Sequence, residues 1–170
     1  MDLGLKGKRA LVMGSSYGMG NGVARGLAAE GADIILTARS GDILETEATD
    51  IANIYGVRVE VLACDFAKEG DIDRLIDFAI AQMDGIDIQF NNCGGPPRLL
   101  PSEVDDKTWH DWFDLIMMSA IRVTNSTLPG MRERGWGRIL SMTSSNILLA
   151  ATENVLSSSL RMSLVGWSKS

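Results

Sequence analysis

Three glycines near the amino terminus have the spacing of a loop that binds phosphate. They stand in Gly14-Ser15-Ser16-Tyr17-Gly18-Met19-Gly20, between an apolar run at 10–13 and a helical pattern that starts near Gly20. Glycines let the backbone turn tightly and approach a pyrophosphate, and the free N–H groups of the helix start then face the anion. We predict that residues 14–20 bind a dinucleotide, with hydroxyl donors from Ser15 and Ser16 and with Tyr17 as a lid or packing residue. A plain strand-to-helix turn is the alternative.

Arg39 stands where dinucleotide-binding sites contact the ribose and distinguish NAD from NADP. About 20 residues beyond the glycines, NAD sites place an acidic side chain on the ribose 2′-hydroxyl. The sequence here is Leu36-Thr37-Ala38-Arg39-Ser40, which offers a guanidinium and no carboxylate. Because arginine binds phosphate through two parallel hydrogen bonds, we predict NADP(H), with Arg39 and Ser40 on its 2′-phosphate. A solvated surface arginine is the alternative.

Strands and helices must alternate to position these residues. Apolar runs predict strands at 10–13, 34–36, 57–61, 86–90 and 139–142, and the alternation at 57–61 favours a place near a sheet edge. Helical patterns follow at 20–30, 44–55, 72–83 and about 105–132, with a last helix after Asn154; the middle of the fourth is apolar nearly all round, which predicts burial on most sides. This alternation predicts a doubly wound parallel α/β sheet with right-handed crossovers.

Composition narrows the class of protein. The chain has 170 residues, 45% hydrophobic and 22% charged, which predicts one globular domain over 1–170. The net charge of −6 argues against nucleic acid and anionic membranes as partners, and no apolar run approaches the ~18 residues of a membrane span. Two cysteines and no secretory signal favour the cytoplasm, and one histidine with two cysteines argues against a metal site.

The sequence resembles the short-chain dehydrogenase/reductase family along essentially its whole length. The Gly-x-x-x-Gly-x-Gly spacing is that of the family, and Asn91-Asn92-Cys93-Gly94 is similar to its Asn-Asn-Ala-Gly. Residues 128–131 and 137–140 are similar to the segment before the fifth strand. The resemblance implies a Rossmann-type fold with strand order 3-2-1-4-5, in which the last strands of the family and its substrate-binding segment are missing here. The apolar sheet surface then exposed would favour a longer parent chain or a covering partner.

The resemblance also implies further contacts and partners. Asp65 and Phe66 would border the adenine, and Asn92, Cys93 and Gly94 would line the side of the adenosine ribose. Cys93 is expected to pack and not to react. The partners implied are a small carbonyl or alcohol substrate and a second copy in a homodimer or homotetramer. Candidate interface residues are Trp112, Phe113 and Met117.

The catalytic positions depart from the family pattern. The family uses a serine and a Tyr-x-x-x-Lys pair on one helical face; these positions correspond to Ser144, Ser157 and Arg161, and a further asparagine corresponds to Ile116. A phenol, with a pKa of about 10, can be drawn towards neutrality by a cation, whereas the hydroxyl of Ser157 is a far weaker acid. Arg161 keeps the positive charge and the ribose-binding donors but cannot release a proton.

Two functions therefore stay open. One is an NADP(H)-dependent oxidoreductase, possible substrates including 3-oxoacyl compounds, in which Ser157 or water delivers the proton beside Arg161. The other is a catalytically impaired nucleotide-binding or scaffold domain. The stretch from Ser157 to Arg161 and the segment Gly94-Gly95-Pro96-Pro97 resemble a divergent branch of the family, so the departures look like a trait of that lineage.

Overall fold

Five parallel strands form the centre of the fold. A computed structural model describes residues 2–68, 70–148 and 152–168. The strands are β1 (Arg9–Met13), β2 (Asp33–Ala38), β3 (Val59–Ala63), β4 (Ile88–Asn91) and β5 (Arg138–Ser141). Their order is β3-β2-β1-β4-β5 with every neighbouring pair parallel, which confirms the predicted order. β3 lies at an edge, as its alternating pattern predicted, although it begins two residues later than expected.

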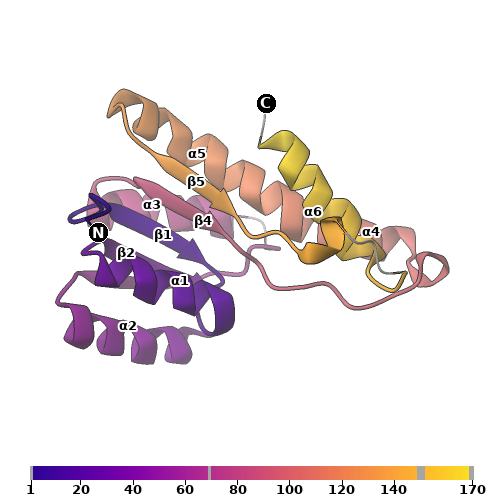
Figure 1. Cartoon of the computed structure of the whole chain (residues 1–170), viewed down its shortest axis with the longest axis horizontal. Helices are drawn as coiled ribbons and strands as arrows, with labels where there is room; N and C mark the ends of the chain where they lie inside the picture. Colours follow the sequence, from indigo (N-terminus) through magenta and orange to yellow (C-terminus); the bar gives the residue numbers. More distant parts are fainter. Residues whose placement is uncertain (1, 69, 149–151, 169–170) are drawn as a thin grey trace.

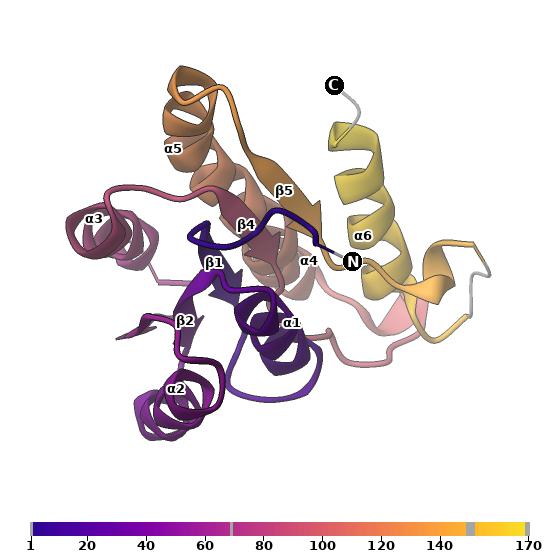
Figure 2. The ribbon, with the colours of Figure 1, turned by 60° about the vertical axis from the view of Figure 1, so that its left-hand side comes forward.

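Helices cover both faces of the sheet. They are α1 (Gly18–Ala29), α2 (Gly41–Tyr55), α3 (Asp71–Met83), α4 (Asp106–Phe113), α5 (Ser119–Glu133) and α6 (Val155–Trp167). Three short elements join them: the 3-10 turns η1 (Pro101–Glu103) and η3 (Ser145–Ile147) and the π-helical turn η2 (Asp114–Met118). Figures 1 and 2 show α1 and α2 on one side of the sheet and α3 and α5 on the other, and α6 packs on α4 and η2.

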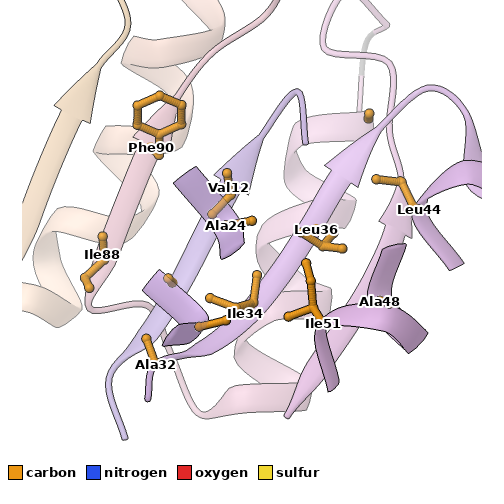
Figure 3. Close-up of a cluster of buried hydrophobic side chains, with 13 residues drawn as sticks. Val12, Ala24, Ala32, Ile34, Leu36, Leu44, Ala48, Ile51, Ile88 and Phe90 are labelled. Atoms are coloured by element: carbon orange, nitrogen blue, oxygen red, sulfur yellow. The ribbon is translucent and has the colours of Figure 1, made fainter. Parts of the chain in front are cut away.

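Alternate residues of each inner strand enter two different cores. In β1, Ala10 and Val12 belong to the cluster under α1 and α2, whereas Leu11 and Met13 belong to the cluster under α3 and α5. All four are at most 1% exposed. Figure 3 shows the first cluster, in which side chains of β1, β2 and β4 meet those of α1 and α2. This period of two on a sheet buried on both faces explains why the strands are continuous apolar runs.

The fourth predicted helix is interrupted by a π-helical turn. Residues 106–133 are helical throughout, but η2 separates α4 from α5, and the hydroxyl of Ser119 donates to the Leu115 carbonyl oxygen at 2.6 Å. Ile116 and Met117 are buried, as predicted, while Phe113 is 42% exposed. The expectation of burial on most sides therefore fails at the end of α4, which faces solvent.

The outer strand β5 leaves apolar side chains uncovered. Ile139 is 36% exposed and Leu140 is 49% exposed. Only β4 pairs with β5 among the strands that the structure describes. The predicted exposure of apolar sheet surface is therefore present.

A buried ion-pair cluster ties together the amino ends of β1 and β4 and the end of α5. The Asp87 carboxylate, 8% exposed, accepts hydrogen bonds from Arg9 Nη2 at 2.7 Å, Arg9 Nε at 2.8 Å and Arg134 Nε at 3.2 Å. Burial by itself would raise the pKa of Asp87. The hydrogen bonds from Arg9 and the charges of both arginines outweigh it and hold the pKa below the usual range. This end of the sheet is opposite to the glycine loop.

Asp87→Asn should lower the free energy of unfolding at pH 7 by about 2 kcal/mol, because it leaves two arginines without their carboxylate. Since the folded-state pKa of Asp87 lies below its unfolded value, this stabilisation is present above the unfolded pKa and is lost as pH falls through the folded pKa. The difference between wild type and variant should shrink below a pH of about 4. Urea unfolding over a range of pH measures both effects.

Glu60→Gln is the control, because it removes the charge of a more exposed ion pair, that with Arg58. It should destabilise far less than Asp87→Asn. Equal losses in the two variants would contradict the role given to the Asp87 cluster.

Candidate functional site

The glycine loop is folded so tightly that two of its positions cannot hold a side chain. Gly14 follows β1 with a φ of +63°, and a Cβ there would lie 2.7 Å from the backbone oxygen of Asn92. A Cβ on Gly20 would lie 2.2 Å from the Gly14 carbonyl oxygen. That oxygen also accepts a hydrogen bond from Asn92 Nδ2 at 3.2 Å. The close packing of three backbone segments argues against a plain turn, because a plain turn would not require these glycines.

Ser15 anchors the glycine loop to β2. Its side chain is fully buried, and its Oγ accepts a hydrogen bond from the Thr37 N–H at 2.8 Å. The Ser15 N–H donates in turn to the Thr37 carbonyl oxygen at 3.2 Å. The prediction that the Ser15 hydroxyl faces a phosphate was therefore wrong, because that hydroxyl is held by the backbone of β2.

A cleft of about 420 Å³ opens above the glycine loop, at the carboxyl ends of β1 to β4. It spans the point between β1 and β4 where the strand order reverses, which is the usual ligand position in open α/β sheets. Its volume is that of a small-molecule site. The predicted residues that line it are Gly14, Ser16, Tyr17, Gly18, Met19, Arg39, Ser40, Asp65, Phe66, Asn92, Cys93 and Gly94. Ser15 and Gly20 lie behind this surface and support it.

Four lining residues were not predicted from the sequence. Ala38 and Gly95 adjoin predicted positions, whereas Trp112 and Leu115 come from α4 and η2. Their spacing of three places both on one helical face, and that was the only signal available. The sequence does not say which face of this helix turns towards the cleft.

The mouth of the cleft carries an arginine that has no partner among the residues that the structure describes. Arg39 is exposed, and no hydrogen bond or ion pair joins its guanidinium to another residue that the structure describes. Ser40 is also exposed and precedes α2 without a side-chain capping bond. Both side chains are therefore available to an anion that enters the cleft beside the start of α2.

Asp65, Phe66 and Cys93, for which the sequence predicts cofactor contacts, line the cleft. The N–H of Asp65 donates to the Asp71 carboxylate at 2.8 Å, which fixes the turn after β3 and leaves Phe66 6% exposed. Burial raises the pKa of the Cys93 thiol to about 11, and the nearby charge of Arg161 opposes this only partly. Cys93 is therefore a neutral thiol at neutral pH and packs against two of the apolar clusters, as predicted.

Arg161 holds two loops together beneath the cleft. It is 7% exposed and donates from Nη1 to the Met142 carbonyl oxygen at 2.7 Å and from Nη2 to the Gly94 carbonyl oxygen at 2.6 Å. These carbonyls follow β5 and β4. The sequence led us to expect Arg161 to offer its donors to a ribose, but two of them are committed to the backbone. Arg161 therefore positions the loops.

The two serines of the expected catalytic set lie on neighbouring elements. Ser144 precedes η3, and its Oγ accepts a hydrogen bond from the Asn146 N–H at 3.3 Å. Ser157 lies half-buried on α6, which packs against η3. Neither side chain is among those that line the cleft above the glycine loop. The structure thus brings these two elements together beside the cleft.

A cavity of about 10 Å³ lies under Arg161, bordered by Asn91, Ser119 and Ile116 among others. This volume is near the lower limit for one water molecule. Ile116, 2% exposed, occupies the position expected for the further asparagine of the family pattern and contributes only apolar surface.

The part of the chain that the structure describes offers neither a cluster of metal ligands nor a membrane-spanning helix. No group of three or more histidine, cysteine, aspartate or glutamate side chains there is arranged to hold a metal ion. None of the helices in that part combines the length and the apolar character needed to cross a bilayer.

Gly20→Ala should lower the free energy of unfolding by about 2 kcal/mol, because the new methyl group would overlap the Gly14 carbonyl. Gly22→Ala, two residues later in α1, is the matched control. Apart from the adjoining backbone of α1 itself, no atom lies within 4 Å of a Cβ at Gly22, so this variant should be as stable as wild type or more stable by about 0.5–1 kcal/mol. Urea unfolding compares the two. Equal effects of the two substitutions would show that the loop is not packed as described.

Comparison with known proteins assigns the family. The family model described as short chain dehydrogenase matches residues 8–163. D-beta-hydroxybutyrate dehydrogenase of Cupriavidus necator is 32% identical over 165 residues, which are 97% of this chain and 64% of that protein. 3-Oxoacyl-[acyl-carrier-protein] reductase FabG of Aquifex aeolicus is 31% identical over 170 residues, which are 100% of this chain and 68% of that protein.

A solved structure agrees with these relatives. L-Sorbose reductase of Gluconobacter frateurii, complexed with NADPH and L-sorbose, superposes with a TM-score of 0.96 at 34% identity and covers 99% of this chain and 64% of the reductase. The chain thus spans less than two thirds of the length of this reductase and of the hydroxybutyrate dehydrogenase. The parallel Rossmann-type sheet, the glycine loop and these matches show that the chain belongs to the short-chain dehydrogenase/reductase family.

Proposed function

We propose that this protein is an NADP(H)-dependent oxidoreductase that transfers a hydride between the nicotinamide and a carbonyl or alcohol substrate. The observation that carries the proposal is the cleft with a floor built of glycines and with the exposed Arg39 at its mouth. The similar proteins are a dehydrogenase and reductases, one of them complexed with NADPH. Substrates to test include 3-oxoacyl compounds, 3-hydroxy acids and ketoses, because the names of these relatives point to them.

The residues of the cleft suit the parts of such a cofactor. Gly14 and Gly20 permit the backbone to approach a pyrophosphate, and the N–H groups at the start of α1 would donate to it. Arg39 and Ser40 would bind the 2′-phosphate. Asp65 and Phe66 would border the adenine, and Asn92 to Gly94 the adenosine ribose.

The chemistry would be divided between cofactor and protein. The bound cofactor supplies or accepts the hydride. Ser144 would orient the substrate carbonyl through its hydroxyl, and Ser157 or a water molecule would move the proton. Arg161 would contribute a buried positive charge near the negative charge that develops on the carbonyl oxygen. Because a serine hydroxyl is a much weaker acid than a phenol, proton delivery would limit the rate.

A second candidate function is a nucleotide-binding or scaffold domain with impaired catalysis. The specific observation in its favour is that Arg161 donates two of its hydrogen bonds to the carbonyl oxygens of Gly94 and Met142. These two donors are then not available to make Ser157 a better acid. In this case the cleft would bind NADP(H) without turnover.

We propose further that residues 1–170 form one domain that acts in the cytoplasm as a homodimer or homotetramer. The two free cysteines support a reducing compartment. For the interface, the exposed Phe113 and the half-buried Trp112 lie on an open surface groove of α4. Met117 is no longer a candidate, because it is 8% exposed and packs inside its own chain.

Arg39→Asp should weaken NADPH binding about 100-fold and NADH binding little, because only NADPH has a 2′-phosphate. Fluorescence titration with both nucleotides measures the two affinities. Arg132→Asp, an exposed position at the end of α5, makes the same change in net charge away from the cleft and serves as the control. An equal loss of NADPH and NADH affinity would reject the role of Arg39.

The double variant Ser157→Tyr/Arg161→Lys tests the proton-delivery step. If wild type turns over slowly for want of a good acid, the pair should raise the rate of NADPH oxidation with a suitable ketone about 100-fold. A panel of 3-oxoacyl thioesters, ketoses and simple ketones is compared by the loss of NADPH absorbance. Ser159→Tyr, on the exposed side of α6, is the matched control.

Three outcomes separate the two functions. Turnover by wild type supports the oxidoreductase. NADPH binding without wild-type turnover, with activity gained only in the double variant, supports the impaired domain. Absence of NADPH binding by wild type contradicts both.

A further inference from the structure

The amide of Asn21 holds the glycine loop from behind. Asn21 lies half-buried in the first turns of α1, next to Gly20. Its Nδ2 donates to the Ser15 carbonyl oxygen at 3.3 Å and to the Glu47 carboxylate at 2.8 Å. Its Oδ1 accepts a hydrogen bond from Arg25 Nε at 3.0 Å. One side chain thus joins the loop, α1 and α2.

These three partners fix the orientation of the amide. The two acceptors, the Ser15 carbonyl and the Glu47 carboxylate, both face Nδ2, and the donor Arg25 faces Oδ1. The reversed amide would place its oxygen against both acceptors and its NH₂ against a cation. Only one orientation is compatible with the surroundings of Asn21.

The orientation of the Ser15 carbonyl determines where the next N–H points. The N–H of a trans peptide points away from its carbonyl, so a carbonyl of Ser15 that is held towards α1 and α2 turns the Ser16 N–H in the opposite direction. Ser16 lines the cleft. Within the described residues, no acceptor is bound to this N–H. Asn21 therefore leaves a donor free at the cleft floor.

Glu47 connects this arrangement to the other end of the cleft. It lies in α2, the helix that starts directly after Arg39 and Ser40, and it is paired with Arg25. Hydrogen bonds from Arg25 and then Asn21 hold the pKa of Glu47 below its usual range, so it is ionised at neutral pH. The bridge from Ser15 through Asn21 to Glu47 thus joins the glycine loop to the helix that begins directly after the proposed 2′-phosphate site.

We propose that Asn21 is a positioning residue for cofactor binding: held by Glu47 and Arg25, it orients the Ser15–Ser16 peptide so that the Ser16 N–H binds the pyrophosphate. The inference rests on the proposed function, because it needs a pyrophosphate in the cleft. Asn21 would not touch the cofactor, but it would set the affinity of the cleft for the pyrophosphate.

The test removes the donor end of the amide, first by a variant that also adds a negative charge beside Glu47 and then by one that adds no charge. Asn21→Asp puts an oxygen against the Ser15 carbonyl and Glu47, so NADPH binding should weaken about tenfold. Asn53→Asp, at an exposed position of α2, makes the same chemical change and should leave NADPH affinity unchanged. Asn21→Ala is measured in parallel in case Asn21→Asp does not fold, and it should also weaken binding of NADPH.

A fragment of the cofactor distinguishes positioning from general loosening. Adenosine 2′-monophosphate has the phosphate proposed for Arg39 but no pyrophosphate, so its affinity should stay within about twofold of wild type in both Asn21 variants. Equal weakening of NADPH and the fragment would overturn the inference, because it would show a merely structural role. Unchanged NADPH affinity would overturn it as well. A wild-type protein that binds neither ligand would instead refute the proposed function.

Discussion

The carbonyl oxygen of Gly14 is the contact around which the candidate site is assembled. Asn92 Nδ2 binds it from the loop after β4, and the Cα of Gly20 approaches it from α1 so closely that a Cβ would lie 2.2 Å away. Because β1 and β4 are adjacent and parallel, the segments that follow them meet at the carboxyl end of the sheet. A side chain at either glycine would push α1 away from the β4 loop, and the floor of the cleft would be lost.

The two ends of the sheet are held by different chemistry. At the amino end, Asp87 forms ion pairs with two arginines and is almost completely buried. At the carboxyl end, the side chains that directly hold the glycine loop are neutral: the Ser15 hydroxyl and the amides of Asn21 and Asn92. Neutral supports leave the positive partial charge of the loop N–H groups uncompensated, which is what an anion-binding floor requires.

Much of this arrangement was accessible from the sequence, because it depends on local patterns. Apolar runs and glycine spacing predicted the parallel sheet and the loop at 14–20, and the family resemblance predicted the strand order and the residues after β3 and β4. Contacts between distant segments were not accessible. Nothing local shows that Arg161 binds the carbonyl oxygens of Gly94 and Met142, or that the fully buried Gln89 donates to Thr124 on α5. Ser15 was misassigned for the same reason, since its acceptor role towards Thr37 becomes visible only when β1 and β2 are paired.

The π-helical turn η2 changes the direction in which the side chains of the following helix α5 point. Such a turn adds one residue to an otherwise regular helix, which shifts everything after it by about 100° around the axis. Trp112, before the turn, and Leu115, within it, meet the cleft; after the turn, Val123 and Met131 meet the core beneath the sheet. A deletion of one residue within 114–118 would restore a continuous α-helix and turn one of these faces to solvent. Over this segment, insertions and deletions are therefore far less tolerable than changes of residue type.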